Sequence, residues 1–143
     1  MNLRIPLLAI SLCTALFLAF TFPDYSGQMG SDLGQYSLSL SVKDVRKSYD
    51  FYTKLGFKPL EGMGSVEEKW IILSNGECRI GLFQDFFPSN TLTFNPTEAR
   101  GVYKILKQEG ISTSFERGIE QERGPCSFVL LDPDENSILI DQH

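Results

Sequence analysis

Histidine is almost absent from this chain of 143 residues, whose single imidazole belongs to His143. Ser-His-Asp triads and Cys-His pairs depend on a well-placed histidine, and many metal sites need several, so the sequence argues against all three. Basic residues are also few, because 13 Lys and Arg stand against 18 Asp and Glu, which gives a formal net charge of −5. Nucleic-acid binding needs a basic face, so we expect no nucleic-acid partner.

Cysteine is scarce as well, with three residues in the chain. Cys78 and Cys126 are the two outside the apolar N-terminal segment, and we expect two separate buried thiols. A disulfide between them is the alternative if the domain reaches an oxidising compartment. Hydrophobic residues at 42% and charged residues at 22% are typical of one globular domain that needs no disulfide or metal for its core.

The one long apolar run lies near the N-terminus. Residues 5–22 carry no charge, follow Arg4 and precede Pro23 and Asp24. This order is typical of a secretory signal peptide, and the run is also just long enough to span a bilayer. We therefore expect residues 1–25 to be a signal peptide or a membrane anchor, followed by a Gly-rich linker at 26–34. The domain is then periplasmic, extracellular or membrane-anchored, and a cytoplasmic chain is the less favoured alternative.

Residues 35–143 divide into two similar halves. Strict alternation at 36–42 predicts a half-buried strand, Asp44 is a helix N-cap, and Gly56 ends that helix. Pro59 indicates that the next strand lies at a sheet edge, and Asn75-Gly76 predicts a hairpin. The strands predicted in the first half are 36–42, 57–60, 69–73 and 78–84.

The second half repeats this order. Its predicted strands are 91–95, 111–115, 126–131 and 137–141, and its helix starts at Pro96 and ends at Gly110. Gly56 and Gly110 are 54 residues apart, and the two first strands are offset by the same number. This period indicates that one βαβββ unit is used twice.

Two motifs in this part of the chain resemble the vicinal oxygen chelate family, which includes glyoxalase I, bleomycin-resistance proteins and extradiol dioxygenases. They are Asp132-Pro133-Asp134-x-Asn136 before the last strand and, earlier, Val42-x-Asp44-x-x-x-Ser48-x-x-Phe51-Tyr52-x-x-Leu55-Gly56-Phe57. The resemblance covers residues 35–143 and implies an α+β fold of two βαβββ units, 35–86 and 89–143. It implies that their mixed sheet curls into an open cup that binds a ligand or metal, with the helices outside. It also implies that two copies often pair as a homodimer.

The resemblance also places the metal-ligand positions of the family. Metal-using members offer one ligand, usually His or Glu, from each of four strands, and those positions fall here on Ser37, Gly81, Thr91 and Leu139. Neutral hydroxyls bind divalent cations weakly, and glycine and leucine side chains offer no donor. We therefore expect no metal and no other cofactor.

Strand alternation predicts the wall of the cup. If Leu38 and Leu40 face the helices, the opposite face carries hydroxyls, one cation, one aromatic ring and one carboxylate. Arg79 is suited to an anionic group, and Phe83 with Trp70 to a flat ligand. The alternatives are an Arg79–Asp141 ion pair and a Trp70 within the core. The candidate ligand-binding residues are Ser37, Ser39, Arg79, Gly81, Phe83, Thr91, Thr93, Leu139 and Asp141.

The sequence thus favours a metal-free module that binds a small organic molecule, with no catalytic residue assigned. One alternative is a metal-dependent lyase or dioxygenase of the glyoxalase type, with an atypical site built from Asp141, Glu61 or Glu68. Another is a membrane-tethered interaction domain that pairs through its sheet edges or Phe86-Phe87. We interpret residues 116–123 as a solvated loop, and His143, which lies outside the four ligand positions, as a frayed terminal residue.

Overall fold

The computed structural model describes residues 32–143. The signal peptide or anchor predicted at 1–25, and the start of the linker, lie outside the described residues, so the expected localisation stays a prediction. No helix within 32–143 is long and apolar enough to cross a membrane. The described elements are β1 (Gln35–Val42), α1 (Val45–Lys54), β2 (Lys58–Ser65), β3 (Trp70–Asn75), β4 (Cys78–Gln84), β5 (Thr91–Asn95), α2 (Ala99–Gln108), β6 (Ser114–Arg117), β7 (Cys126–Leu131) and β8 (Ser137–Gln142).

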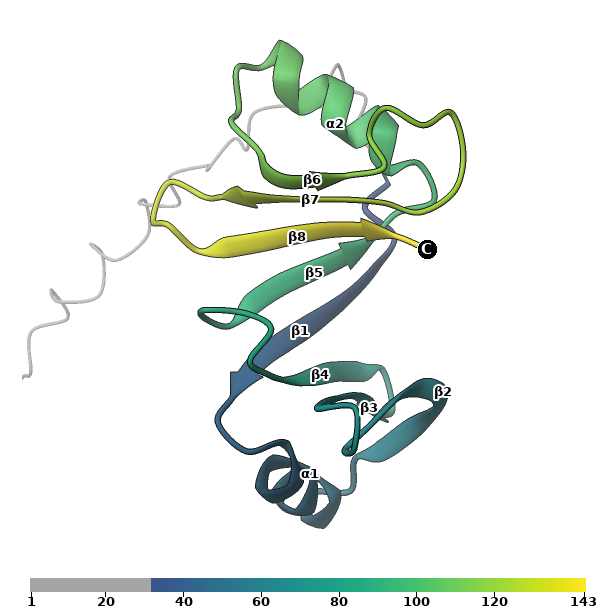
Figure 1. Cartoon of the computed structure of the whole chain (residues 1–143), viewed down its shortest axis with the longest axis vertical. Coiled ribbons are helices and arrows are strands. Elements are labelled where there is room, and N and C mark those ends of the chain that lie inside the picture. The colour runs from purple at the N-terminus through teal and green to yellow at the C-terminus, as the bar shows by residue number, and fades with distance from the viewer. Residues whose placement is uncertain (1–31) are drawn as a thin grey trace, which may run out of the picture. The chain divides into compact units, whose positions relative to one another are not determined.

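The strands form one open mixed sheet in the order β2-β3-β4-β1-β5-β8-β7-β6 (Figure 1). In the first repeat β1 runs parallel to β4, and in the second β5 runs parallel to β8. The repeats meet where β1 and β5 pair antiparallel, with Leu38 opposite Leu92. This architecture confirms the predicted α+β fold of two βαβββ units with an open sheet. Pro59 does lie in an edge strand, β2.

Each repeat has its own apolar core on the helix side of the sheet. Val45 of α1 packs with Leu73 and Leu82, and Val102 of α2 packs with Phe128, in two separate clusters. Figure 1 shows α1 and α2 at opposite ends of the sheet. Since Leu38 and Leu40 pack toward the first cluster, period-2 alternation leaves the serines of β1 on the other face.

The helix signals are partly confirmed. The Asp44 carboxylate accepts the Lys47 backbone N–H at 3.0 Å, which caps α1, and Gly56 adopts a left-handed φ of +89° just after its end. Pro96 does not start the second helix, which begins at Ala99. Residues 96–98 instead bridge strand and helix, and the Ala99 N–H donates to the Gln142 side chain at 2.9 Å.

β3 (Trp70–Asn75) ends two residues later than predicted, and two further strands differ from the prediction because their pairing is irregular. β2 continues to Ser65 through a register shift between Pro59 and Gly64, where Gly64 has a φ of +79°. β6 starts at Ser114 and contains Phe115 at a φ of +49°, with a shift in its pairing to β7. Bulges of this kind break the alternation that the prediction uses.

The thiols of Cys78 and Cys126 are both free. Cys126 is buried, as predicted, with a pKa raised by its burial. Cys78 is exposed, which corrects the prediction, because it opens β4 directly after the tight turn at Gly76.

Candidate functional site

A cavity of about 560 Å³ lies against the sheet face that carries the β1 serines. Its volume falls in the range of small-molecule sites in proteins. Both repeats line it, from strands β1 to β5 and from β8. The lining residues are Gln35, Ser37, Ser39, Met63, Trp70, Ile72, Arg79, Phe83, Phe87, Thr93, Asn95, Leu139, Asp141 and His143.

Seven of the nine predicted ligand-binding residues line this cavity: Ser37, Ser39, Arg79, Phe83, Thr93, Leu139 and Asp141. Their contact with a ligand stays a prediction. Thr91 lies on the same face but is only 1% exposed, and its hydroxyl contacts the Ser89 carbonyl and the Ser137 hydroxyl at 3.2 Å each. Gly81 lies beneath Phe83, since a Cβ built on Gly81 would come within 2.3 Å of that ring.

Two hydroxyls form the floor of the cavity where the repeats meet. Ser39 Oγ and Thr93 Oγ1 are 2.8 Å apart, and these residues are separated by 54 positions, the period of the repeat. Both are buried and satisfy each other. Ser37 is also buried, yet its hydroxyl makes no hydrogen bond within residues 32–143, and it opens into the cavity. A hydroxyl in this position can donate to or accept from a ligand, and the contact itself stays a prediction.

The donor set does not fit a divalent metal ion. The family positions carry the hydroxyls of Ser37 and Thr91, of which the second is already hydrogen-bonded to the protein, and no donor at Gly81 or Leu139. Within residues 32–143, no three His, Cys, Asp or Glu side chains gather around a common point. Of the three residues offered as alternatives for an atypical metal site, Asp141 lines the cavity and Glu61 and Glu68 do not.

Aromatic rings form one wall. Trp70 and Phe83 are stacked, with centroids 6.1 Å apart and planes 4° from parallel, and Phe87 meets Phe83 edge-on at 5.0 Å. Trp70 lines the cavity rather than the core, because it lies opposite Phe83 in the β3–β4 register. Phe86 contacts the same ring at 5.8 Å and is 56% exposed, and a role for it in pairing two copies stays a prediction.

Polar groups gather at one end of the cavity. The Arg79 guanidinium donates to the Gln35 side chain rather than pairing with Asp141 as the alternative had it. The Asp141 carboxylate lies 3.5 Å from the His143 imidazole. Burial raises the pKa of Asp141, and the charges of His143 and Arg117 act in the opposite direction.

His143 lines the cavity, which differs from its interpretation as a frayed terminal residue. If the strand alternation is continued by two residues beyond Asp141, it predicts that His143 faces the cavity. Continued by two residues before Ser37, it predicts the same for Gln35. Met63 had no such signal, since it lies beyond the predicted end of its irregular strand. Sequence reasoning also left Ile72 and Phe87 outside the site.

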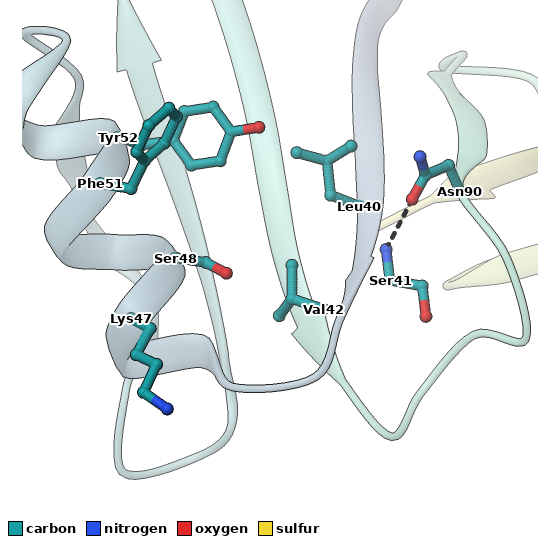
Figure 2. A pocket seen from close by; sticks show the side chains of 8 residues that line it. All are labelled: Leu40, Ser41, Val42, Lys47, Ser48, Phe51, Tyr52 and Asn90. Carbon is teal, nitrogen blue, oxygen red and sulfur yellow. Dashed lines mark hydrogen bonds between the residues drawn. The ribbon is translucent and has the colours of Figure 1, made fainter.

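A second hollow, of about 480 Å³, lies on the helix side of the sheet between α1 and β1 (Figure 2). Phe51 and Tyr52 border it from the helix, and the Asn90 side chain accepts the Ser41 N–H at 3.1 Å on its far side. Lys47 is the only charged residue among its eight lining residues. The hollow is lined by residues of the first repeat and of the loop that follows it, whereas polar residues of both repeats line the sheet cavity.

Comparison with known proteins shows the family. The model of the Glyoxalase/Bleomycin resistance protein/Dioxygenase superfamily matches residues 34–140. No curated protein matches the chain in sequence.

Solved structures share the fold at low identity. A Legionella pneumophila protein described as an NAD-dependent benzaldehyde dehydrogenase is 22% identical, with a TM-score of 0.58 over 75% of this chain and 97% of that one. A superfamily member from Vibrio splendidus is 13% identical, with a TM-score of 0.58 over 76% and 98%. Methylmalonyl-CoA epimerase from Mycobacterium tuberculosis is 10% identical, with a TM-score of 0.51 over 81% and 93%. With the family match and this shared fold, the chain belongs to the glyoxalase, bleomycin resistance protein and dioxygenase superfamily.

Proposed function

We propose that the domain binds a small organic molecule in the sheet cavity and does so without a metal ion. The observation that carries the proposal is the cavity itself, which has a volume of about 560 Å³, is lined from both repeats and lies in the sheet cup where the resemblance to the family implies a ligand. Of the four family ligand positions, Ser37 and Leu139 line the cavity, and a hydroxyl and an apolar side chain suit an organic molecule better than a cation.

The wall chemistry supports a ligand with a flat apolar part. Trp70, Phe83 and Ile72 offer apolar surface on one side, and stacking on aromatic rings contributes about 0.5–1.5 kcal/mol beyond area burial. The Ser37 hydroxyl gives a polar contact that can donate or accept. This mixture of apolar surface and few polar groups is typical of small-molecule sites.

Binding of indole to the full-length chain tests the proposal. Indole is flat, uncharged and small enough for the cavity, and the titration is followed by ¹H–¹⁵N chemical-shift mapping in buffer that contains EDTA. We expect shifts at the amides of β1, β4 and β5 around Ser39, Phe83 and Thr93. Absence of binding, or shifts confined to α1, would contradict the proposal.

Two matched substitutions locate the site. Phe83→Leu removes a ring from the cavity, and Phe51→Leu removes a ring from the hollow beside α1. We expect Phe83→Leu to weaken indole binding by about 2- to 10-fold and Phe51→Leu to leave it unchanged. The reverse pattern would place the ligand on the helix side of the sheet and overturn the proposal.

A further inference from the structure

A row of polar side chains crosses four strands at one end of the cavity. Gln35 and Asn95 face each other in the β1–β5 register. The Arg79 guanidinium on β4 donates to the Gln35 side chain, and the Asn95 amide donates to the Asp141 carbonyl at 2.8 Å on β8. A cation and an anion therefore stand at opposite ends of this row, with two carboxamides between them.

Neither charge is neutralised by a permanent partner. Within residues 32–143 the Arg79 guanidinium has no ion pair, and its bond to Gln35 uses one of its five N–H donors. Asp141 contacts only His143 in an ion pair, and that imidazole carries a charge only when protonated. The Asp141 side chain is 28% exposed, so its carboxylate lacks part of the hydration it has in water. The charge of Arg117 also lowers the pKa of Asp141 but makes no ion pair with it, so a bound ligand would add a direct counter-charge to each group.

The spacing of the two charges suits a short zwitterion. In the sheet register Asp141 is level with Asn95 and Gln35, whereas Arg79 lies two residues away along the strands, and its side chain reaches this level by its hydrogen bond to Gln35. Two strand spacings then remain between Gln35 on β1 and Asp141 on β8. The remaining gap is about 9–10 Å. An ammonium and a carboxylate on one carbon, each with a hydrogen bond to the protein, span about 9 Å.

The two repeats place different groups at equivalent positions beside this row. Ser39 pairs with Gly81 in the first repeat, and Thr93 pairs with Leu139 in the second. Phe83 lies two residues beyond Gly81 on β4, and Asp141 lies two residues beyond Leu139 on β8. One side of the cavity therefore offers an aromatic ring where the other offers a carboxylate.

We propose that the cavity selects a zwitterionic molecule with a flat aromatic group, with its carboxylate at Arg79 and its ammonium at Asp141. The inference rests on the proposed ligand-binding function and names the class of ligand. The ring of the ligand lies against Phe83 and Trp70, and the carboxamides of Gln35 and Asn95 bond the polar atoms between the charges.

Four ligands that share one ring test the inference: L-tryptophan as zwitterion, tryptamine as cation, indole-3-propionate as anion and indole without charge. Their affinities for the full-length chain are measured by isothermal titration calorimetry at pH 7.5. We expect L-tryptophan to bind about 10-fold more tightly than either singly charged ligand, because each ionic hydrogen bond adds to the shared stacking.

Substitutions assign each charge to its partner. Arg79→Gln lowers L-tryptophan affinity to that of tryptamine and leaves tryptamine unchanged. Asp141→Asn lowers the affinity for L-tryptophan to the affinity for indole-3-propionate, and it leaves the affinity for indole-3-propionate unchanged. Arg123→Gln and Asp134→Asn, on exposed loops outside the cavity, serve as matched controls and leave all four affinities unchanged.

The outcomes separate the two proposals. If indole binds in the cavity and all four ligands bind equally, the zwitterion inference is wrong and the proposed function stands. If L-tryptophan binds more tightly but neither variant changes this, the assignment of the charges is overturned. If no ligand binds, including indole, the proposed function fails for aromatic molecules and the inference fails with it.

Discussion

Gly81 fixes the position of the aromatic wall, although it offers no side chain to the cavity. A Cβ at this residue would lie 2.3 Å from the Phe83 ring and 3.0 Å from the Ile72 methyl group. Both side chains therefore rest on the bare backbone of β4. The position to which the resemblance assigns a metal ligand supports an aromatic ring in this chain.

Gly81→Ala is expected to push the Phe83 ring into the cavity and to lower the free energy of unfolding by about 1–2 kcal/mol through overpacking. It should also weaken indole binding. Chemical denaturation measures the first effect and titration the second. Gly101→Ala is the control, because a Cβ at that helical glycine would make only an ordinary contact with Glu98 Cβ at 3.9 Å, and alanine there should stabilise by about 0.5–1 kcal/mol. An unchanged indole affinity in Gly81→Ala would show that Phe83 does not rest on Gly81.

Asp141 carries a stability penalty that a ligand would relieve. Its pKa is raised by burial, so the folded state binds a proton more tightly than the unfolded chain does, and ionisation at higher pH costs folding free energy. The charges of His143 and Arg117 reduce this penalty, and Asp141 itself helps to raise the pKa of the Cys126 thiol.

Asp141→Asn is therefore expected to raise the free energy of unfolding at pH 7. The gain should shrink as the pH falls through the raised pKa and vanish below the ordinary value of 3.8. Urea denaturation at several pH values measures it. Asp134→Asn on the exposed turn before β8 is the control, with an expected change within about 0.5 kcal/mol. A loss of stability in Asp141→Asn at pH 7 would contradict the account.

Among the elements, regular alternation was a reliable guide and irregular backbone was not. β1, β4, β5 and β8 follow period 2, and the sequence predicted them to within one residue at each end. β2 and β6 are edge strands with register shifts, whose bounds depend on tertiary pairing. The cavity residues on these four regular strands could therefore be predicted from the sequence, whereas Met63 on the irregular strand β2 could not.

The loop between β6 and β7 is more ordered than its charges suggest. Most of its side chains are exposed, as predicted, but Arg100 of α2 organises its backbone. The guanidinium donates to the Gly118 carbonyl at 2.7 Å and to the Gly124 carbonyl at 3.1 Å. A single planar side chain thus holds both ends of the loop against the helix.

Arg100→Lys is expected to destabilise the protein by about 1–2 kcal/mol, because an ammonium cannot reproduce the forked hydrogen bonds to separate carbonyls. Hydrogen exchange should become faster at amides 118–125 and stay unchanged in β1. Arg46→Lys is the matched control, since Arg46 makes one exposed ion pair with Glu67 and should cost less than about 0.5 kcal/mol. Unchanged exchange in the loop would show that Arg100 does not order it.

At the scale of the whole domain, the two repeats are joined at a single strand pair. The Ser39–Thr93 hydroxyl contact lies at this junction and forms the cavity floor. The repeat period predicted that these residues correspond, but only the antiparallel pairing of β1 with β5 shows that they touch. The same limit applies to Thr91, whose burial against Ser137 depends on the neighbouring β8.

A double-mutant cycle tests the coupling at the junction. Ser39→Ala and Thr93→Val each leave a buried hydroxyl without its partner and should cost about 1–2 kcal/mol. The double variant should cost about 1 kcal/mol less than the sum, because neither hydroxyl remains. Thermal and chemical unfolding measure the cycle, and Thr97→Val at an exposed position is the control. Strict additivity would mean that the hydroxyls do not stabilise each other.

Metal independence is the most direct test of the central claim, because it separates this cavity from the metal centres of its superfamily. The measurement is the indole affinity of the full-length chain after exhaustive dialysis against EDTA and again after addition of equimolar Zn²⁺ or Ni²⁺. The side chains at Ser37, Gly81, Thr91 and Leu139 predict the same affinity in all conditions, to within about twofold. Binding that is lost with EDTA and restored by either metal would contradict the account.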